Sequence, residues 1–419
     1  MSSFIINGGR HLVGESFVTG AKNSVLPLLS ATYLCDCETV LHNCPELTDV
    51  DASLKILEFL GCKCKREDKT LIIDSSGCDG FVIPETLMRE MRSSIVFLGA
   101  VASKCKKAVM SLPGGCELGP RPIDIHIDAL KKLGADVQFC NGKIICTMNE
   151  LVDDCNIHLN FPSVGATENI ILAAVLAKGE TVIRNAAREP EIIDLADFLN
   201  SAGAKIYGAG DSTVTVCGVD RLNKTEHTVI PDRIVAATYM SAVAVSGGEV
   251  LLNNVNREHL HPVVPAFLEA GCELDYVGDS LYFNAPKKLK PVGMIRTGVY
   301  PGFPTDAQPP VLSMSAFADG TSVFVENIFE NRFKHVGELV RMSANVRVEG
   351  KVAVVEGSSK LNGAKVDAGD LRGGAALVVA GIGAVGITEI SGVDYINRGY
   401  ENIVENLKGL NANICLVDK

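Results

Sequence analysis

The chain has 419 residues, a formal net charge of −11 and an apolar share of 47%. A chain of this length is expected to form two or more domains, each with its own core. The acidic balance argues against a general nucleic-acid-binding surface, and the lack of an apolar run of about 18 residues argues against a membrane-spanning helix.

The composition favours an α/β protein with many tight turns and close packing of small side chains, because it includes 40 glycines, 5% aromatic residues and no tryptophan. The N-terminal stretch MSSFIINGGRHLVGESFV alternates like a strand and lacks the apolar core and cleavage site of a signal peptide. We therefore expect the protein in the cytosol.

The 14 cysteines are scattered, which favours reduced thiols that pack as small apolar side chains. Most lie in apolar or strand-like surroundings, including Cys105, Cys146, Cys155, Cys217, Cys272 and Cys415. Two pairs, Cys35 with Cys37 and Cys62 with Cys64, have one-residue gaps and no accompanying histidine pair. This spacing does not fit a zinc site, and no metal is expected.

A helix that runs into a short strand recurs six times along the chain, at a period of roughly 70 residues. The turns between helix and strand fall at Gly61, Gly134, Gly203, Gly271, Ser343 and Asn411. Each copy also contains an earlier apolar helix that runs into a strand. A repeat therefore reads as helix, strand, helix, strand and then a hairpin-like stretch before the next repeat.

The chain ends after the sixth helix and strand, without the hairpin-like stretch that follows the other repeats. The missing stretch is found at the N-terminus as FIINGGRHLVGESFV. We expect residues 1–20 to complete the last repeat. One domain would then span residues 21–230, and the other would combine residues 1–20 with 231–419. Two chain crossings near 20 and 230 would allow hinge closure around a cleft.

Charged residues recur at equivalent places in the repeats. The first helix opens with Lys22-Asn23, Arg92-Ser93, Glu168-Asn169, Arg233, Asp306 and Arg372 in successive repeats. The second helix opens near an arginine in five of the six, at Arg121, Arg188, Arg257, Arg332 and Arg398. A helix N-terminus disfavours a cation, so arginines placed there indicate an anionic ligand more readily than simple exposure to solvent.

The segment PGGCELGPRP (113–122) places Cys116 on a glycine- and proline-rich loop, five residues before Arg121. Such a loop must hold special backbone angles or move. A nearby arginine and helix N-terminus would favour the thiolate. The residues alone leave two readings open, a chemically active cysteine and an ordinary loop thiol.

Two other features are interpreted as structural. The residues Gly381 to Gly386 match the pattern GxGxxG, but they end a helix and lead into a strand, which is the reverse of a dinucleotide-binding motif. We therefore expect no nicotinamide cofactor. His126 lies within the helix expected over 123–130 and is interpreted as structural or as a neighbour of a ligand.

At these residues the chain resembles the enolpyruvyl transferases, specifically those that act on a uridine-diphosphate sugar. The blocks that carry the resemblance are GAKNSVLPLLSA (20–31), MRSS (91–94), PGGCELGPRPIDIHI (113–127), FPSVGATENI (161–170), NAAREPEI (185–192), PDR (231–233), FPTDAQ (303–308), ENIFENRFKHV (326–336), DLR (370–372) and INRGYENI (396–403). They span nearly the whole chain. The resemblance implies two inside-out α/β barrel domains, each of three βαβαββ repeats, with a cleft between them.

The implied reaction transfers enolpyruvate from phosphoenolpyruvate to the 3′-hydroxyl of UDP-N-acetylglucosamine and releases phosphate, at the first committed step of peptidoglycan synthesis. By resemblance Cys116 is the proton donor and forms a covalent phospholactoyl adduct. Asp306 matches the base or final proton shuttle. Whether Asp306 or Lys22 makes which proton transfer stays open, as does the place of the adduct on or off the main path.

The resemblance also implies the substrate contacts. Lys22, Arg121 and Arg398 would hold the phosphate, and Arg332 and Arg372 the carboxylate or the transition state. Asp370 would orient Arg372, and Arg92 would meet the loop 113–122, which would close over the bound sugar nucleotide. Asn23 would hold the sugar, and Arg121, Pro122, Ser163, Val164, Gly165 and Ile328 would line the uridine-diphosphate and uracil site. Arg233 completes the expected substrate site. No cofactor, nucleic acid or membrane partner is implied, and the oligomeric state stays open.

Two departures from the family pattern are Pro309-Pro310, which could delay the following helix, and Ser343, which stands where a glycine is usual. Two alternatives remain. The first is 5-enolpyruvylshikimate-3-phosphate synthase, which shares fold and donor but lacks the GGCxxG and SVGAT segments. The second is a catalytically silent paralogue that binds the sugar nucleotide. Since Cys116 is present, alkylation by fosfomycin is expected.

Overall fold

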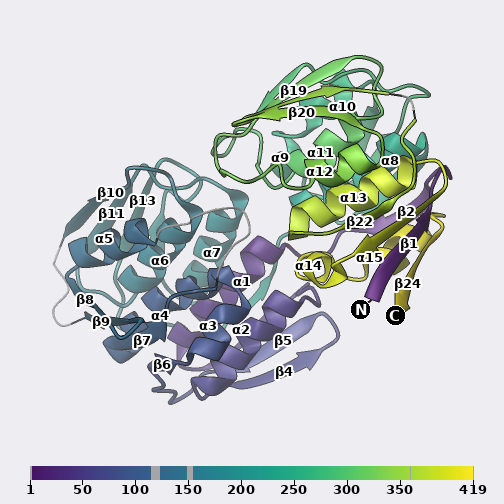
Figure 1. The fold of residues 1–419 in the computed structure, drawn as a ribbon. Coiled ribbons are helices and arrows are strands. Elements are labelled where there is room, and N and C mark those ends of the chain that lie inside the picture. Colours follow the sequence, from purple (N-terminus) through teal and green to yellow (C-terminus); the bar gives the residue numbers. More distant parts are fainter. Residues whose placement is uncertain (1, 115–122, 149–153, 359, 419) are drawn as a thin grey trace. The chain divides into compact units, whose positions relative to one another are not determined.

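The computed structural model describes residues 2–114, 123–148, 154–358 and 360–418 (Figure 1). The chain folds into two units. The first lies between Gly20 and Ile230, and the second combines the residues up to Thr19 with those from Pro231 onward. None of the helices in the described ranges combines the length and the hydropathy needed to cross a bilayer.

The first unit contains three repeats. The first repeat has α1 (Lys22–Thr32), the 3-10 helix η1 (Tyr33–Cys35), β3 (Glu38–His42), α2 (Thr48–Phe59), β4 (Lys63–Glu67) and β5 (Thr70–Asp74). The second has β6 (Val82–Ile83), α3 (Glu85–Glu90), the 3-10 helix η2 (Arg92–Val96), α4 (Phe97–Cys105), β7 (Lys107–Ser111), α5 (Asp124–Lys132), β8 (Ala135–Cys140) and β9 (Lys143–Met148). The third has β10 (Cys155–His158), α6 (Val164–Ala174), β11 (Glu180–Arg184), α7 (Pro190–Ser201), β12 (Lys205–Tyr207) and β13 (Thr213–Cys217). The following β14 (Glu226–Thr228) pairs parallel with β3 and completes the sheet of the first repeat.

The second unit begins with β1 (Ser2–Asn7) and β2 (Val13–Phe17) and continues with three more repeats. The fourth repeat has α8 (Arg233–Ser246), β15 (Glu249–Asn253), α9 (Arg257–Leu260), α10 (Val264–Glu269), β16 (Glu273–Val277) and β17 (Ser280–Asn284). The fifth has β18 (Met294–Arg296), α11 (Gln308–Ser315), β19 (Thr321–Val325), α12 (Val336–Arg341), β20 (Asn345–Glu349) and β21 (Val352–Glu356). The sixth has β22 (Lys365–Asp367), α13 (Leu371–Gly383), β23 (Ile387–Ser391), α14 (Val393–Asn397), α15 (Ile403–Gly409) and β24 (Ile414–Asp418).

The described strands form six four-stranded sheets that share one topology. In the third repeat, β10 runs parallel to β11, while β13 pairs antiparallel with both β11 and β12. The same order recurs in the other sheets, as in β18-β19-β21-β20 of the fifth repeat. The six repeats expected from the sequence are therefore real structural units.

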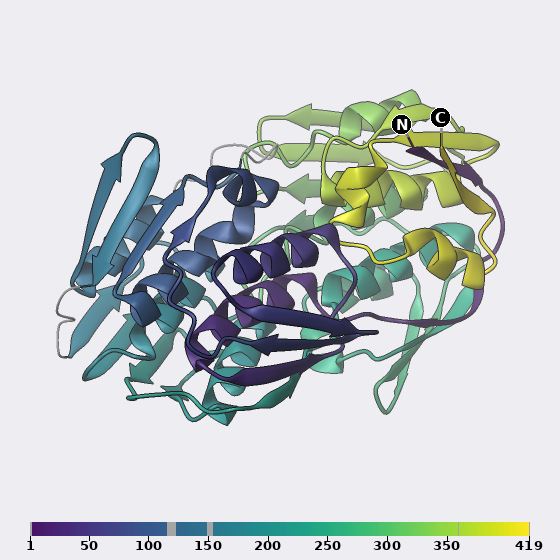
Figure 2. The same cartoon turned by 90° about the horizontal axis from the view of Figure 1, so that it is seen from below.

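The N-terminal strands complete the second unit. β1 lies between β23 and β24 of the sixth repeat and pairs antiparallel with both, so the two chain ends lie side by side (Figure 2). β2 instead runs parallel to β15 of the fourth repeat. The expectation that residues 1–20 complete only the last repeat is thus corrected, because this segment supplies strands to two sheets.

The hairpin of each repeat also differs from its expected position. β20 and β21 form the hairpin of the fifth repeat, whereas β22 belongs to the sheet of the sixth. The two strands of the expected hairpin-like stretch therefore belong to different sheets. The first strand, such as β21, pairs with the strand before it, and the second, such as β22, is the first strand of the next repeat's sheet. Periodicity alone could not separate these strands, because both alternate in the same way.

Helices lie inside each unit and sheets lie outside. In the second unit α8, α11 and α13 pack against one another, and most of their side chains are buried (Figure 1). Strands such as β15 alternate between buried and exposed side chains, so one face of the sheet meets solvent. Glycines permit this close packing, since a Cβ at Gly383 would approach Phe317 to 2.8 Å. This arrangement confirms the predicted inside-out α/β barrels.

The turns that end the second helices confirm the repeat register. Gly61, Gly134, Gly203, Gly271, Ser343 and Asn411 all have positive φ, between 72° and 102°. In the first repeat Gly61 N–H donates to Glu58 O and Cys62 N–H to Leu57 O, which is a Schellman motif. Ser343 and Asn411 adopt the same left-handed geometry without being glycine.

Two smaller expectations are corrected. Helix α11 begins at Gln308 despite Pro309 and Pro310, because proline fits the first turn, where no intrahelical N–H donor is needed. Cys415 is exposed rather than packed in the core, while Cys146, Cys155 and Cys272 are buried. All cysteines in the described ranges are free thiols. The GxGxxG segment ends α13 and precedes β23, as expected of a helix exit.

Candidate active site

Lys22 is the first residue of α1 and lies almost entirely inside the first unit. Its Nζ lies 2.7 Å from Oδ2 of Asp49, and the two side chains are 11% and 4% exposed. Asp49 stands in the first turn of α2, the one second helix without an arginine near its start. No motif in the sequence indicates this ion pair, although the missing arginine in one of the six repeats was a usable signal.

The residue after Asn23 anchors the start of α1. Ser24 Oγ donates a hydrogen bond to the buried Asp194 carboxylate on α7. The other oxygen of Asp194 lies 2.7 Å from His227 Nε2 on β14. One carboxylate thus fixes three elements around the turn that presents Lys22 and the half-buried Asn23. These three residues come from separate parts of the chain, so no motif spacing could reveal them.

The predicted sugar-nucleotide residues Ser163, Val164 and Gly165 form the start of α6. Ser163 is its N-cap and accepts a hydrogen bond from Ala166 N–H at 3.3 Å. Gly165 packs closely, because a Cβ there would lie 3.1 Å from His126 Cε1. His126 is buried, and its Nδ1 lies 2.9 Å from Asn169 Nδ2. This placement fits both interpretations of His126, as a structural residue and as a neighbour of a ligand.

Burial lowers the pKa of His126 to about 4, with a further contribution from the positive charge of Arg92. The imidazole is therefore neutral at physiological pH. Arg92 begins η2 and is half-buried, which agrees with its expected place at a helix start.

Two of the six expected first-helix positions are corrected: Glu168 does not open its helix, and Asp306 precedes α11, which begins at Gln308. Helix α6 already begins at Val164, so Glu168 lies in its second turn. Burial raises the pKa of Glu168 to about 8, and the nearby carboxylates of Glu191 and Glu189 contribute. Glu168 is therefore mostly protonated at neutral pH.

In the second unit, two buried guanidinium groups hold the carboxylate of Asp306. Arg332 Nη2 donates to Asp306 Oδ1 at 2.6 Å, and Arg372 Nε donates to Oδ2 at 3.3 Å. The arginine side chains are 1% and 2% exposed, whereas that of Asp306 is 26% exposed. Asp306, Arg332 and Arg372, which the sequence predicted as site residues, are thus in contact, and Asp306 is the most exposed of the three.

Arg372 is held by both its backbone and its side chain. Asp370 is the N-cap of α13 and accepts from the Arg372 and Gly373 N–H groups, so it orients Arg372 through the helix start. The guanidinium lies 5.2 Å from the Tyr400 ring centroid. Although burial alone would lower it, the pKa of Arg372 is raised by Tyr400 and Asp306. Its buried Nη1 has no hydrogen-bond partner among the described residues.

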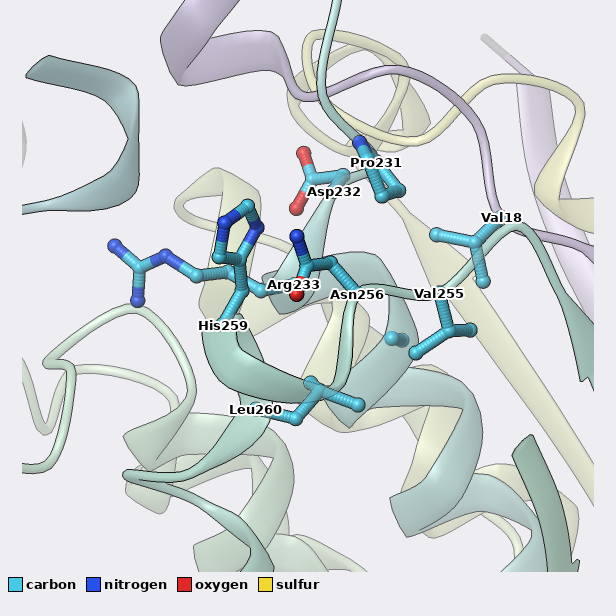
Figure 3. Close-up of a pocket in the computed structure, with 9 residues that line it drawn as sticks. Val18, Pro231, Asp232, Arg233, Val255, Asn256, His259 and Leu260 are labelled. Atoms are coloured by element: carbon cyan, nitrogen blue, oxygen red, sulfur yellow. The ribbon is translucent and has the colours of Figure 1, made fainter. Parts of the chain in front are cut away.

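Arg233 begins α8 and stacks over Tyr300, with its guanidinium carbon 5.7 Å from the ring centroid. The preceding Asp232 caps the helix by accepting from two backbone N–H groups. A small pocket lies at this helix start, and Figure 3 shows the Asp232 carboxylate beside the His259 ring. It is lined by Val18, Pro231, Asp232, Arg233, Ala236, Val255, Asn256, His259 and Leu260.

The expected register of arginines at second helices is correct in part. Arg257 is the first residue of α9. Arg188 instead precedes α7, Arg332 precedes α12, and Arg398 follows α14 as its C-cap and precedes α15. These three side chains are placed by turns before the helices, so the dipole argument does not apply to them. The repeat pattern correctly located these arginines after the strand that follows the first helix of their repeats. It did not show that they precede the second helix instead of beginning it.

Three predicted site residues, Cys116, Arg121 and Pro122, lie outside the described residues. Among the others, Lys22, Asn23, Arg92, Ser163, Val164 and Gly165 belong to the first unit, and Arg233, Asp306, Ile328, Arg332, Asp370, Arg372 and Arg398 belong to the second. Buried arginine and lysine donors can bind an anion, and a carboxylate held between two guanidinium groups can exchange a proton with a bound hydroxyl.

Comparison with known proteins agrees with this chemistry. A family model described as EPSP synthase (3-phosphoshikimate 1-carboxyvinyltransferase) matches residues 6–407. UDP-N-acetylglucosamine 1-carboxyvinyltransferase 2 from Caldanaerobacter subterraneus is 51% identical over 417 residues, with 100% of both chains covered. The protein of the same name from Bacillus cereus is 48% identical, over 99% of this chain and 96% of that protein.

Solved structures share the fold. The enolpyruvyl transferase NikO from Streptomyces tendae superposes with a TM-score of 0.90 at 22% identity, over 99% of each chain. EPSP synthase from Acinetobacter baumannii gives a TM-score of 0.77 at 18% identity, over 100% of each chain. The chain therefore belongs to the EPSP synthase family of enolpyruvyl transferases and, within it, groups with the UDP-N-acetylglucosamine 1-carboxyvinyltransferases.

Proposed function

We infer that this protein transfers the enolpyruvyl group of phosphoenolpyruvate to the 3′-hydroxyl of UDP-N-acetylglucosamine and releases phosphate. The observation that carries this function is the 51% identity, over the whole chain, to a relative named for that activity. The paired arginines around Asp306 support it, because they supply cationic donors and a carboxylate in one place.

The reaction is an addition followed by an elimination. In the addition, the sugar hydroxyl oxygen bonds to C2 of phosphoenolpyruvate while C3 gains a proton and the hydroxyl loses one. In the elimination, C3 loses a proton, the bond from C2 to the phosphate oxygen breaks, and phosphate leaves. Both steps need a group that moves protons and cations that hold the negative charge.

Asp306 is proposed to take a proton in this sequence. It is the partly exposed member of its cluster, so a bound substrate could reach it. Arg332 and Arg372 would hold the substrate carboxylate and stabilise charge in the transition state, since buried guanidinium groups interact strongly with anions. Nη1 of Arg372, which has no hydrogen-bond acceptor among the described residues, is proposed as a donor for such an anion.

The first unit is proposed to supply the phosphate and sugar contacts. Lys22 would hold the phosphate, with Asp49 fixing its ammonium group. Asn23 and the start of α6 would contact the sugar nucleotide. Arg398 of the second unit and Arg121 are also proposed for the phosphate, Arg92 for the loop 113–122, and Cys116 for proton donation to C3.

Phosphate release measured with two different acceptors tests the function. Purified protein with phosphoenolpyruvate and UDP-N-acetylglucosamine should release phosphate, and omission of either substrate should abolish the release. Shikimate 3-phosphate in place of the sugar nucleotide should support no release. Equal or greater release with shikimate 3-phosphate would favour the alternative acceptor, and no release with either would favour a silent binding protein.

The proposed role of Cys116 has its own test. Cys116→Ala and Cys116→Ser should lose phosphate release, because neither side chain is a comparable acid at neutral pH. Cys116→Asp should retain activity and resist alkylation by fosfomycin, because a carboxyl can donate a proton but is not a soft nucleophile. Full activity of Cys116→Ala would rule out the proton-donor role.

A further inference from the structure

A buried glutamate that begins the block 326–336, and to which the sequence assigned no role, organises the residues around Asp306. Glu326 directly follows β19 and is 1% exposed. Thr305 Oγ1 donates to it at 3.1 and 3.0 Å from its two oxygens, and the N–H groups of Ile328 and Phe329 donate to Oε1 at 2.8 and 2.9 Å. No ion pair joins Glu326 to a lysine or arginine in the described part of the chain.

The same position has a different residue in other repeats. The parallel strand pairs align Val325 with His42, Arg184 and Asn253, so Glu326 is equivalent to Asn43, Asn185 and Asn254. Those three asparagines have φ values of 56°, 56° and 58°, and their amides donate to the carbonyls of Val229, Leu159 and Val18.

The fifth repeat departs from this pattern at one residue. Glu326 is not among the residues with a left-handed backbone. The bond to the neighbouring strand is made one residue later, where Asn327 Nδ2 donates to Thr297 O at 2.9 Å. The link between strands is thus kept without Glu326. The carboxylate is therefore not needed for the strand link and is available for another task.

That task is visible in the partners of Thr305. The Thr305 carbonyl accepts hydrogen bonds from Nε and Nη2 of Arg332 at 3.0 and 2.8 Å. The next residue is Asp306, which Arg332 also contacts. Glu326 therefore holds the Thr305 side chain, while Arg332 holds its carbonyl. A dehydrated carboxylate is costly unless several donors satisfy it, and here three groups do so.

We propose that Glu326 is a positioning residue for enolpyruvyl transfer, which fixes Asp306 and Arg332 through Thr305 and shapes the backbone at Ile328. This role rests on the proposed function. A displacement of about 1 Å in a catalytic group can lower turnover about 100-fold, so the buried bonds should affect kcat. The backbone bond at Ile328 should affect the KM for the sugar nucleotide.

Steady-state kinetics of Glu326→Ala, Glu326→Gln and Thr305→Val test the proposal. We expect kcat to fall about 100-fold in Glu326→Ala and at least 10-fold in Thr305→Val. Glu326→Gln should stay within about 10-fold of wild type, because its amide oxygen can accept from both N–H groups and its NH₂ can donate to Thr305. The KM for UDP-N-acetylglucosamine should rise in Glu326→Ala but not in Thr305→Val. Glu349→Gln, an exposed change in the same repeat, is the matched control.

The double variant Thr305→Val/Glu326→Ala separates positioning from general destabilisation. If Glu326 acts through Thr305, the double variant has a kcat close to that of Glu326→Ala alone. The role would be overturned, and the function left intact, if the fold-losses in kcat of the two single variants multiplied in the double variant. It would also be overturned if folded Glu326→Ala or Thr305→Val kept a kcat within threefold of wild type. Absence of turnover in the wild-type protein would instead overturn the proposed function and this role with it.

Discussion

At the scale of single residues, the second unit concentrates buried charge around Asp306. Arg332 differs from a lysine in one respect that matters here, because its planar guanidinium bonds a carbonyl and a carboxylate at the same time. This fork holds Oδ1 of Asp306, while Oδ2 accepts from Arg372. The chemistry proposed for the site depends on that geometry as much as on charge.

Replacement of Arg332 by lysine tests this dependence. A lysine ammonium cannot reproduce the two bonds to Thr305 O together with the bond to Asp306, so we expect kcat to fall about 100-fold in Arg332→Lys. Phosphate release gives kcat, and circular dichroism checks that the variant is folded. Arg341→Lys, an exposed arginine in the same repeat, should be unchanged. Wild-type kcat in Arg332→Lys would show that charge alone suffices.

The buried carboxyl of Glu168 predicts a dependence of stability on pH. Its pKa is raised from 4.5 to about 8 in the folded state, so the folded protein binds more protons than the unfolded chain between these values. The contribution of Glu168 to the free energy of unfolding is therefore greatest below pH 4.5 and is lost as pH rises to about 8. Glu168→Gln should remove this contribution to the slope.

Urea unfolding of wild type and Glu168→Gln at pH 6, 7 and 8 would measure the effect. The variant should gain stability relative to wild type as the pH rises across this series. Glu180→Gln, an exposed position at the start of β11, should track wild type at each pH. A constant difference between Glu168→Gln and wild type over the series would contradict the raised pKa.

At the scale of elements, the end of each second helix is fixed by one left-handed residue. Four repeats use glycine, and the sixth uses Asn411, a residue type that tolerates this conformation. Ser343 of the fifth repeat has φ 72° and is the least suited residue type of the set. The backbone of Ser343 is therefore strained, because the turn requires a positive φ that serine disfavours.

Substitution at this turn should relieve the strain. We expect Ser343→Gly to stabilise the protein by about 1 kcal/mol, less the loss of the exposed bond from Asn362 Nδ2 to Ser343 Oγ. Thermal unfolding gives the shift in Tm. The reverse change in the equivalent turn, Gly271→Ser, should lower Tm because Gly271 has φ 92°. A lower Tm for Ser343→Gly would show that the hydrogen bond of the Ser343 hydroxyl stabilises the protein by more than the backbone strain destabilises it.

The sequence predicted the elements better than it predicted their partners. Lys22, Asp306 and Arg372 were found because charge recurs at equivalent helix starts. Asp49, Asp194 and Glu326 were missed because each acts through a contact with a residue from another element. Only Asp49 could have been noticed, because an acidic residue stands near the start of its second helix, where the other repeats have an arginine. Glu326 was hidden inside a quoted motif, where nothing distinguishes a buried carboxylate from an exposed one.

At the scale of the whole molecule, the N-terminal segment is an integral part of the second unit. Phe4 and Ile6 on β1 are 2% and 1% exposed, and β1 lies between two strands from the far end of the chain. The repeat count predicted this closure, because the last repeat lacked a segment that the N-terminus carries. The second sheet that β2 completes could not be predicted, since strand pairing depends on tertiary contacts.

Truncation of one core side chain on β1 measures this integration. Ile6→Ala should lower the free energy of unfolding by about 2–5 kcal/mol, as expected for a large core side chain. Val13→Ala on β2, where the side chain is 42% exposed, should have a much smaller effect. Urea unfolding gives both values. Equal and negligible losses would mean that the segment behaves as a tail rather than as part of the sheet.

The central claim is that the chain is an enolpyruvyl transferase with UDP-N-acetylglucosamine as acceptor. Proton NMR of the reaction mixture, with released phosphate measured in parallel, tests it most directly. We predict new vinyl signals of an enol ether on the sugar nucleotide, formed in equal amount with phosphate and only when both substrates are present. Phosphate released without the enol ether, or no turnover of either substrate, would contradict the account.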